Sequence, residues 1–293
     1  MPTALVTGAA GFTGKYVVSA LARRGYRVFG MGLGVPSGDD WVPCDLTNKA
    51  QTKDSVGRIT PDIVVHLAAL AFVPEGNPED FYRVNVFGTL NLLEALASIE
   101  RRPSRVLIAS SANVYGNTSA RELDEETCPA PVNHYAASKL AMEHMVKTWF
   151  DRLPIVITRP FNYTGPGQDE RFVIAKIVAH YRHRAETIKL GDTAIERDFS
   201  DIGDIVEAYM RLLENSARSE ILNICSGTAI SIASVLSEMN AIAGYKMQVE
   251  VDAALIRQND IPRLVGDNRK LQKVTGFAPA TPIHETLRRM YAS

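Results

Sequence analysis

Short apolar runs alternate with amphipathic segments over the first half of the chain. The first run, Thr3–Thr7, is apolar and β-branched, which predicts a buried strand. Similar runs predict further strands at residues 27–31, 41–44, 63–67, 105–110 and 155–159. Because the segments between them have helical apolar spacing, the pattern predicts right-handed βαβ crossovers and a parallel, doubly wound α/β sheet of the Rossmann type.

The composition of the sequence changes after Pro160. Pro, Gly and Asn are frequent up to Gln168, and shorter apolar runs follow. We therefore expect residues 1–161 to form a dinucleotide-binding Rossmann domain and residues 162–293 to form mainly a smaller, mixed α/β substrate region. The helical pattern of residues 202–213 predicts that a segment near 200–225 returns to the larger domain.

A glycine-rich turn follows the first strand directly. Gly8, Gly11 and Gly14 are spaced three residues apart, and residues 15–24 have the apolar spacing of a helix. Such a strand, turn and helix let the backbone approach a pyrophosphate at the positive N-terminal end of the helix. Glycines also serve ordinary turns, but the position at the first strand of a βαβ chain favours dinucleotide binding.

Tyr135 and Lys139 stand four residues apart in a helical segment, so their side chains share one helix face. An ammonium group beside a phenol favours the phenolate and lowers the phenol pKa from its reference of about 10. Such a Tyr exchanges a proton near neutral pH, which a carbonyl requires when hydride reaches its carbon. Taken alone, the pair equally fits a half-buried aromatic beside a solvated Lys.

Composition excludes several other classes. The chain has 293 residues with 32 basic and 33 acidic side chains, so it offers no global field that would recruit nucleic acid or an anionic membrane. Cys44, Cys128 and Cys225 lack metal-site spacing and predict reduced, mostly buried thiols and no metal site. The longest apolar stretch, 63–73, contains His66 and is too short to span a membrane. No export signal precedes the first strand, so a cytoplasmic location is expected.

Several short segments along the chain form a specific set: TGAAGFTG (7–14), CDL (44–46), HLAA (66–69), NVFGT (85–89), SSANVYG (110–116), YAASK (135–139), RPFNYTGPGQ (159–168), ERDFSD (196–201) and NICSG (223–227). Together they resemble the extended short-chain dehydrogenase/reductases that act on nucleotide sugars, the NAD-dependent epimerase/dehydratase family. The resemblance covers essentially the whole chain. The last three segments are most similar to the subgroup of GDP-sugar 4-keto reductases.

The resemblance implies a Ser-Tyr-Lys triad of Ser111, Tyr135 and Lys139. Ser111 would bind the substrate oxygen that gains or loses a proton, and Lys139 would also hold the nicotinamide ribose. Ser110 is expected to satisfy the strand end. The resemblance assigns the cofactor site to Gly8, Gly11, Phe12, Thr13, Gly14, Asp45, Leu46, Leu67, Ala68, Ala69, Tyr135 and Lys139. Asp45 equally fits a helix N-cap.

The choice between NAD and NADP is open. NAD-specific members place a carboxylate at the end of the second strand to bind the adenosine 2′-hydroxyl, and NADP users supply an Arg nearby. Here residues 30–34 are Gly-Met-Gly-Leu-Gly, so neither marker is present. The absent carboxylate removes a repulsion against a 2′-phosphate, which favours NADPH slightly.

On the substrate side, the resemblance implies a nucleotide-diphosphate-sugar site. Its expected residues are Asn162, Phe172, Val173, Arg197 and Arg257. Arginine suits pyrophosphate because its guanidinium is a forked donor. Each Arg also fits an ordinary surface position, and Arg263 is an alternative to Arg257.

Reduction is the favoured reaction. Sugar dehydratases of the superfamily need an added acid/base pair just after the catalytic Ser, where this chain has Ala112 and Asn113. A Cys/His pair that moves protons at carbon is not found, since His134 is expected to face away. The resemblance favours GDP-4-keto-6-deoxy-D-mannose as substrate. C4 epimerisation on retained NAD needs only the same triad and stays open, and a non-enzymatic dinucleotide sensor is disfavoured because the triad is retained.

The resemblance also implies a homodimer. Related enzymes pair the helix after Asn85 with the helix that bears Tyr135 in a four-helix bundle. Residues 87–96 are apolar at near-helical spacing, which fits such an interface and fits ordinary core equally well.

Overall fold

The computed structural model describes residues 1–71, 77–118, 120–255 and 261–293. The chain forms two compact units, and each is described by itself. Unit 1 comprises Met1–Val114, Pro131–Arg159 and Val206–Leu222, and unit 2 comprises Tyr115–Ala130, Pro160–Ile205 and Asn223–Ser293.

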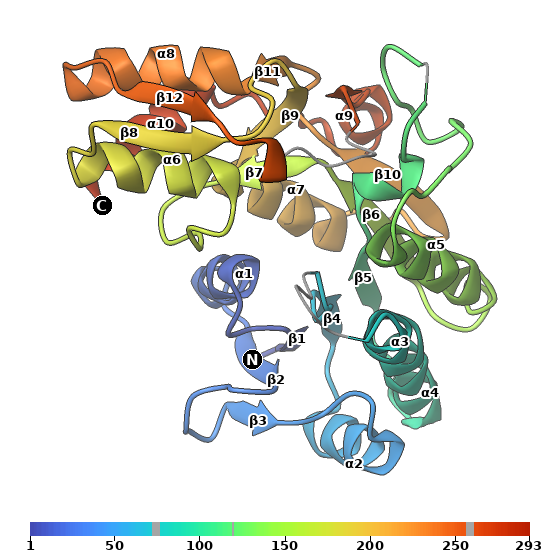
Figure 1. Cartoon of the computed structure of the whole chain (residues 1–293). Coiled ribbons are helices and arrows are strands. Elements are labelled where there is room, and N and C mark those ends of the chain that lie inside the picture. Colours follow the sequence, from blue (N-terminus) through green and yellow to red (C-terminus); the bar gives the residue numbers. More distant parts are fainter. Residues whose placement is uncertain (72–76, 119, 256–260) are drawn as a thin grey trace. The chain divides into compact units, whose positions relative to one another are not determined.

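Unit 1 is organised around a seven-stranded sheet with the order β10-β6-β5-β4-β1-β2-β3 (Figure 1). Its strands are β1 (Thr3–Thr7), β2 (Arg27–Gly32), β3 (Trp41–Pro43), β4 (Ile63–His66), β5 (Arg105–Ala109), β6 (Ile155–Pro160) and β10 (Glu220–Ile224). The pairings from β3 through β6 are parallel. The doubly wound sheet predicted from the alternation is therefore confirmed.

Helices connect these strands. They are α1 (Phe12–Arg23), α2 (Lys49–Ile59), α3 (Glu79–Tyr82), the π-helix η1 (Arg83–Gly88), α4 (Thr89–Ser98), the 3-10 helix η2 (Ala112–Tyr115), α5 (His134–Lys147) and α7 (Ile202–Glu214). Helix α2 is capped by Asn48, whose side chain accepts a hydrogen bond from the Gln51 N–H. The alternative that Asp45 caps this helix is therefore wrong.

The core of unit 1 is formed by apolar side chains from the strands and the covering helices. Leu5, Val64 and Ile108 from the sheet pack with Leu92 and Leu96 of α4, and all are fully buried. Burying each such side chain contributes about 1.5–3 kcal/mol, which fixes α4 on the sheet.

Unit 2 is a smaller mixed α/β structure. Its elements are β7 (Asn162–Thr164), α6 (Val173–Arg182), β8 (Thr187–Leu190), β9 (Glu196–Asp201), β11 (Ala229–Ser231), α8 (Ile232–Ala243), β12 (Gln248–Val251), η3 (Ala253–Leu255), β13 (Arg263–Leu264), α9 (Arg269–Thr275) and α10 (Ile283–Ala292). Strand β9 pairs with β7, β11 and β13, and β12 pairs with β8. Ile174, Val235 and Leu287 of α6, α8 and α10 share the core of this unit.

Candidate active site

The glycine-rich turn of unit 1 is packed too tightly for larger residues. Gly8 has φ of +71°, and a Cβ there would lie 2.8 Å from the Ala68 nitrogen. A Cβ at Gly14 would lie 2.3 Å from the Gly8 carbonyl oxygen. Gly11 forms the N-cap of α1 and brings no side chain over the helix end. The turn therefore presents bare backbone at a positive helix terminus, which fits a pyrophosphate.

The segments predicted at the adenosine part of the cofactor lie beside this turn or in contact with α4. The Leu67 and Ala68 N–H groups donate to the carbonyl and hydroxyl oxygens of Thr7, at 3.2 Å each. Ala69 is half-buried next in the chain. Leu46 is buried, and its carbonyl accepts a bond of 2.8 Å from the Asn91 amide on α4.

Asp45 forms a local turn. Its carboxylate accepts hydrogen bonds from the Thr47 N–H at 2.9 Å and from the Thr47 hydroxyl at 2.8 Å. The side chain is half-buried, and its place between β3 and α2 is set by that turn.

Helix α5 carries Tyr135 and Lys139. It begins where the Asn133 side chain accepts a hydrogen bond of 2.9 Å from the Ala136 N–H, so Tyr135 lies in the first turn. The Tyr135 ring packs against Phe81 of α3, with 6.3 Å between ring centroids. Phe81 was not singled out by the sequence, because one aromatic residue in a short helix gives no distinctive signal.

Lys139 is buried, with 3% of its surface exposed, and its Nζ donates to the Ala109 carbonyl oxygen at 2.7 Å. That bond ties α5 to the carboxyl end of β5. Burial lowers the pKa of Lys139 to about 8, and the Glu143 carboxylate one turn later on α5 opposes the shift. The ammonium form therefore still predominates at neutral pH.

Two serines follow β5. Ser111 is buried, and its hydroxyl accepts a bond of 3.2 Å from the Asn113 N–H. The Ser110 N–H donates to the Thr158 carbonyl at 2.7 Å, but within the described residues the Ser110 and Thr158 hydroxyls have no hydrogen-bond partner. Ser110 satisfies the strand end, as expected, but does so through its backbone N–H and not through its hydroxyl. Its backbone has that role because the sheet ladder continues for one residue beyond β5.

A buried ion pair holds α5 against β6. Arg159 donates to both carboxylate oxygens of Glu143, at 3.0 and 2.7 Å, and both side chains are at most 3% exposed. This bidentate geometry is the strongest form of such a pair. It joins the helix that bears Lys139 to the neighbouring strand.

The substrate residues expected in unit 2 are more accessible. Asn162 on β7 is exposed, Phe172 before α6 is 50% exposed, and Val173 is half-buried. Arg197 on β9 is half-buried, and its guanidinium donates to the Glu196 carbonyl oxygen at 2.9 Å. Arg257 lies outside the described residues. The alternative, Arg263, forms an ion pair with Glu196.

A buried carboxylate next to Arg197 was missed by sequence reasoning. Asp198 is fully buried and accepts bonds from the Ser226 N–H, the Ser226 hydroxyl and the Gly227 N–H, at 2.9, 2.8 and 2.7 Å. Burial raises the pKa of Asp198, and these donors oppose the shift. The pattern Arg-Asp-Phe gave no signal for this role, because the partners lie 28 and 29 positions later.

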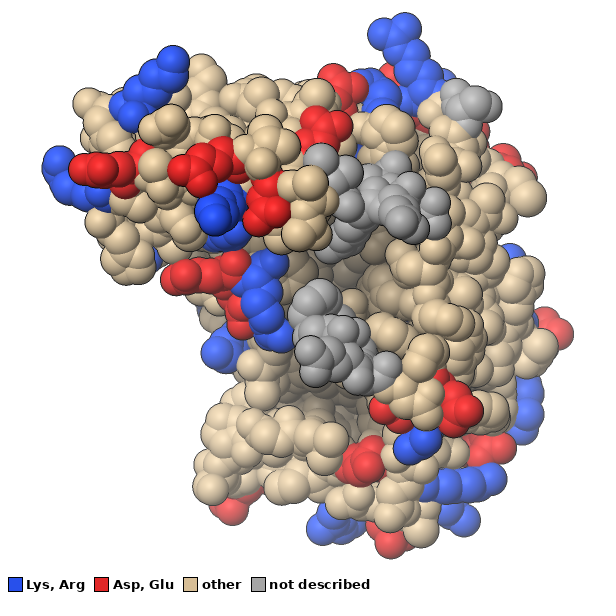
Figure 2. Space-filling model, in the orientation of Figure 1, with Lys and Arg blue, Asp and Glu red and all other residues tan. Residues whose placement is uncertain are grey.

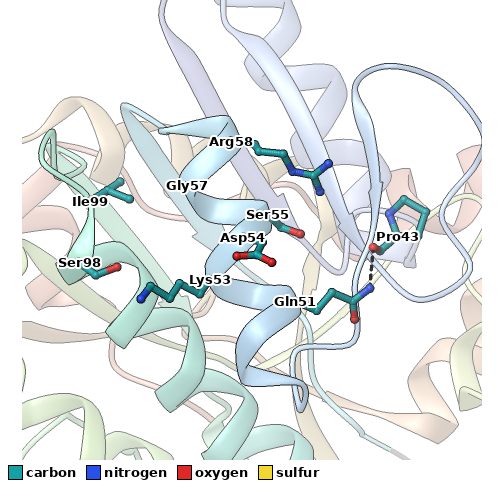
Figure 3. A pocket seen from close by; sticks show the side chains of 9 residues that line it. All are labelled: Pro43, Gln51, Lys53, Asp54, Ser55, Gly57, Arg58, Ser98 and Ile99. Atoms are coloured by element: carbon teal, nitrogen blue, oxygen red, sulfur yellow. Dashed lines mark hydrogen bonds between the residues drawn. The ribbon is translucent and has the colours of Figure 1, made fainter.

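A separate hollow of unit 1 contains none of the predicted site residues. It has a volume of about 760 Å³ and lies along α2, between Pro43 and Ile99 (Figure 3). Figure 3 shows Gln51 pointing to the Pro43 carbonyl, to which it donates at 3.2 Å. Lys53 and Arg58 are exposed here, as solvated residues of an amphipathic helix are.

Basic and acidic side chains are interspersed on the face shown in Figure 2. Among the described residues, no cluster of three or more His, Cys, Asp or Glu is arranged to hold a metal ion. Within the same residues, no helix is long and apolar enough to cross a bilayer. Cys44 and Cys225 are buried and Cys128 is exposed, all as free thiols.

The chain is similar to a family of known enzymes over almost its whole length. The family model described as GDP-mannose 4,6 dehydratase matches residues 5–290. A GDP-6-deoxy-D-talose 4-dehydrogenase from Aggregatibacter actinomycetemcomitans is 36% identical over 93% of this chain and 90% of its own length. A GDP-6-deoxy-D-mannose reductase from Pseudomonas aeruginosa is 34% identical over 97% of this chain and 94% of its own length.

A solved structure of a related protein has the same fold as this chain. RMD from Pseudomonas aeruginosa, complexed with NADPH, superposes with a TM-score of 0.87 at 32% sequence identity. The match covers 100% of this chain and 98% of that chain. The prediction of an extended short-chain dehydrogenase/reductase, an enzyme class that uses NAD(P), is confirmed.

Proposed function

Because the chain belongs to the GDP-mannose 4,6 dehydratase family of extended short-chain dehydrogenase/reductases, we propose that it reduces the 4-keto group of GDP-4-keto-6-deoxy-D-mannose. The two relatives support this choice because their names describe 6-deoxy-D-talose and 6-deoxy-D-mannose, which differ only at C4 and share one 4-keto form. Dehydration is not proposed, since Ala112 and Asn113 follow Ser111 and supply no acid/base pair.

The triad residues are proposed to manage the proton and the orientation of the ketone. Tyr135 donates a proton to the C4 oxygen, and the Ser111 hydroxyl holds that oxygen in place. Lys139 supplies a fixed positive charge beside the phenol. The single observation that carries this proposal is the burial of Lys139, whose Nζ is bonded to the Ala109 carbonyl at the carboxyl end of β5. Ligands bind at that edge in doubly wound sheets.

The cofactor is proposed to be NADPH in preference to NADH. When bound, it supplies the hydride that reaches C4. The Gly8, Gly11 and Gly14 turn is proposed to hold its pyrophosphate, and Leu46 with residues 67–69 to line the adenosine pocket. The complex of RMD with NADPH supports this preference, as does the missing carboxylate after β2.

Recognition of the sugar nucleotide is proposed for unit 2. Arg197 is a forked donor suited to the diphosphate, and Asn162, Phe172 and Val173 are proposed to contact the sugar and the base. A homodimer through a four-helix bundle of α4 and α5 and a cytoplasmic location also remain predictions. Phe87 supports the former, because it precedes α4 and is 58% exposed.

The test is a reduction assay with freshly prepared GDP-4-keto-6-deoxy-D-mannose. Loss of the reduced-nicotinamide absorbance is followed with NADPH and then with NADH, and Tyr135→Phe serves as the inactive control. We expect stoichiometric oxidation of NADPH by the wild type. NMR of the product then shows whether C4 has the talose or the mannose configuration. Tightly bound NAD in the purified protein, with no reduction and with interconversion of C4-epimeric nucleotide sugars, would instead establish an epimerase.

A further inference from the structure

Unit 1 contains a network of buried polar side chains. It consists of the side chains of Thr7, His66, Asn85, Thr89 and Ser138, all of which are at most 1% exposed. We call it the His66 network. His66 is the last residue of β4 and interrupts an otherwise apolar stretch of the sequence, residues 63–73, which is the sequence signal that points to the network.

The protons in this network are assigned by its own geometry. The Thr89 hydroxyl donates to the Asn85 carbonyl at 2.7 Å, so toward the His66 Nε2, at 2.8 Å, it is left to accept. Burial lowers the pKa of His66 to about 3, with the nearby Lys139 ammonium adding to the shift. His66 is therefore neutral with its proton on Nε2, and its Nδ1 accepts from the Thr7 hydroxyl at 2.7 Å.

One end of the network reaches the backbone that is proposed to hold the dinucleotide. The Thr7 hydroxyl accepts a bond of 3.2 Å from the Ala68 N–H. Thr7 directly precedes Gly8, where a Cβ would lie 2.8 Å from that same Ala68 nitrogen. The ends of β1 and β4 are thus held at one fixed separation.

The other end reaches the catalytic helix. The Asn85 amide is bonded to both backbone groups of Leu70, at 2.8 and 3.1 Å, and donates to the Ser138 hydroxyl at 2.9 Å. Ser138 in turn donates to the Tyr135 carbonyl at 2.8 Å. Asn85 lies in the π-helix η1, a distortion of helical bonding that is frequent at functional sites.

We propose that the His66 network is a positioning device, which sets the placement of Tyr135 and Lys139 relative to the dinucleotide turn. His66 and Asn85 are positioning residues that act through Thr7 and Ser138, and neither transfers the reaction's proton. This role rests on the proposed reduction at the triad. The network is saturated: each donor meets an acceptor, so breaking it anywhere between β1 and α5 releases the same constraint.

A double-mutant cycle between Thr89→Val and Ser138→Ala tests this role. These substitutions break the network on opposite sides of Asn85. We expect each to lower kcat by about 10-fold, the scale of one lost buried hydrogen bond, and the double variant to lose no more than the more damaged single variant. Losses that multiply in the double variant would overturn the proposal.

The chain offers two matched controls. Thr52 is fully buried on α2, and its hydroxyl donates to the carbonyl four residues earlier, as that of Thr89 does. Thr52→Val is expected to leave kcat unchanged and to show no coupling with Ser138→Ala. Thr89→Ser keeps the hydroxyl and is expected to retain the wild-type kcat, whereas a loss equal to that of Thr89→Val would show a packing role only.

The assay separates this proposal from the proposed substrate. Thermal unfolding of each variant confirms that it is folded at the assay temperature. If the wild type binds NADPH but does not reduce the sugar, the substrate proposal fails. The same cycle is then measured on the NADPH dissociation constant, which we expect to rise non-additively because α5 also carries Lys139. Additive changes there would overturn the positioning role as well.

Discussion

The two units hold their candidate functional residues in different ways. In unit 1, Ser111 and Lys139 are buried, and Lys139 is tied to β5 by a hydrogen bond and to the Glu143–Arg159 pair by helix α5. In unit 2, Asn162 and Phe172 are exposed and Arg197 is half-buried. The difference supports the proposal that the fold itself builds the geometry of proton transfer and that side chains of unit 2 contact the sugar nucleotide directly.

Burial also changes what each charge contributes. The Arg159–Glu143 pair lies in the interior of unit 1, whereas the side chains of the Arg171–Asp169 pair of unit 2 are 66% and 50% exposed. A buried ion left without its partner is costly, while an exposed pair is screened by water. Unit 1 therefore depends on its polar contacts for stability and geometry together.

The largest expected effect is on catalysis in unit 1. Tyr135→Phe removes the proposed proton donor and should lower kcat by about 10²- to 10⁴-fold, the usual contribution of a general acid. The dissociation constant for NADPH should hardly change, because the phenol hydroxyl is one contact among many. Steady-state kinetics and fluorescence titration measure both quantities. A turnover close to that of the wild type would show that Tyr135 is not the acid.

The next effect is on stability. Arg159→Met leaves the Glu143 carboxylate buried without its partner and should lower the free energy of unfolding by about 3–5 kcal/mol. Replacing both partners, with Glu143→Leu added, should recover much of that loss. Arg171→Met in unit 2 breaks an exposed pair, serves as the control and should leave the unfolding midpoint unchanged. Urea denaturation measures the free energy of unfolding of each variant. Equal losses for the two single arginine variants would show that the buried pair of unit 1 contributes no more stability than the exposed pair of unit 2.

A third effect is on the pH dependence of stability. The pKa of His66 is about 3 in the folded chain, against about 6.5 when unfolded, so only the unfolded chain takes up this proton as pH falls from 6.5. The group costs no stability above pH 6.5. Its cost grows below that value to about 3 kcal/mol at about pH 4.5, and it levels off below pH 3.

His66→Gln cannot take up this proton and should therefore lose less stability than the wild type between pH 7 and about pH 4.5. Urea denaturation at the two pH values measures the difference. Parallel losses in the two proteins would show that His66 is protonated in the folded state. No catalytic measurement is needed, so this outcome is independent of the substrate.

The smallest expected effect belongs to unit 2. Arg197→Ala should raise KM for the nucleotide sugar by about 10- to 100-fold, the scale of 1.5–3 kcal/mol for a lost charge-assisted hydrogen bond, while kcat changes less. Arg171→Ala is a control on an exposed Arg of the same unit, which pairs with Asp169. A loss confined to kcat would show that Arg197 acts in the chemical step. It would contradict the assignment of catalysis to unit 1 and recognition to unit 2.

Residues 87–96 show what apolar spacing in a sequence does and does not predict about burial. The apolar spacing predicted either core or a dimer interface. The structure divides the stretch, since Leu93 and Leu96 are buried in unit 1 while Phe87 is 58% exposed on η1. The π-helix changes the residues per turn at that point, so a single helical spacing could not place all the side chains on one face.

The sequence by itself determined the features that depend on near neighbours. Alternating periodicities predicted the parallel sheet, and glycine spacing predicted the first turn. The four-residue spacing of Tyr135 and Lys139 predicted that both share a helix face, because helical geometry repeats over that distance.

Only the tertiary structure decided the partners of the buried polar groups. Thr7 and His66 are 59 positions apart, and Asn85 and Ser138 are 53 apart, so no local pattern links them. The same limit explains why the sequence did not show that the Ser110 hydroxyl is left without a partner among the described residues. Hydrogen bonds form between groups that packing brings within about 3 Å, and packing is settled by the whole core.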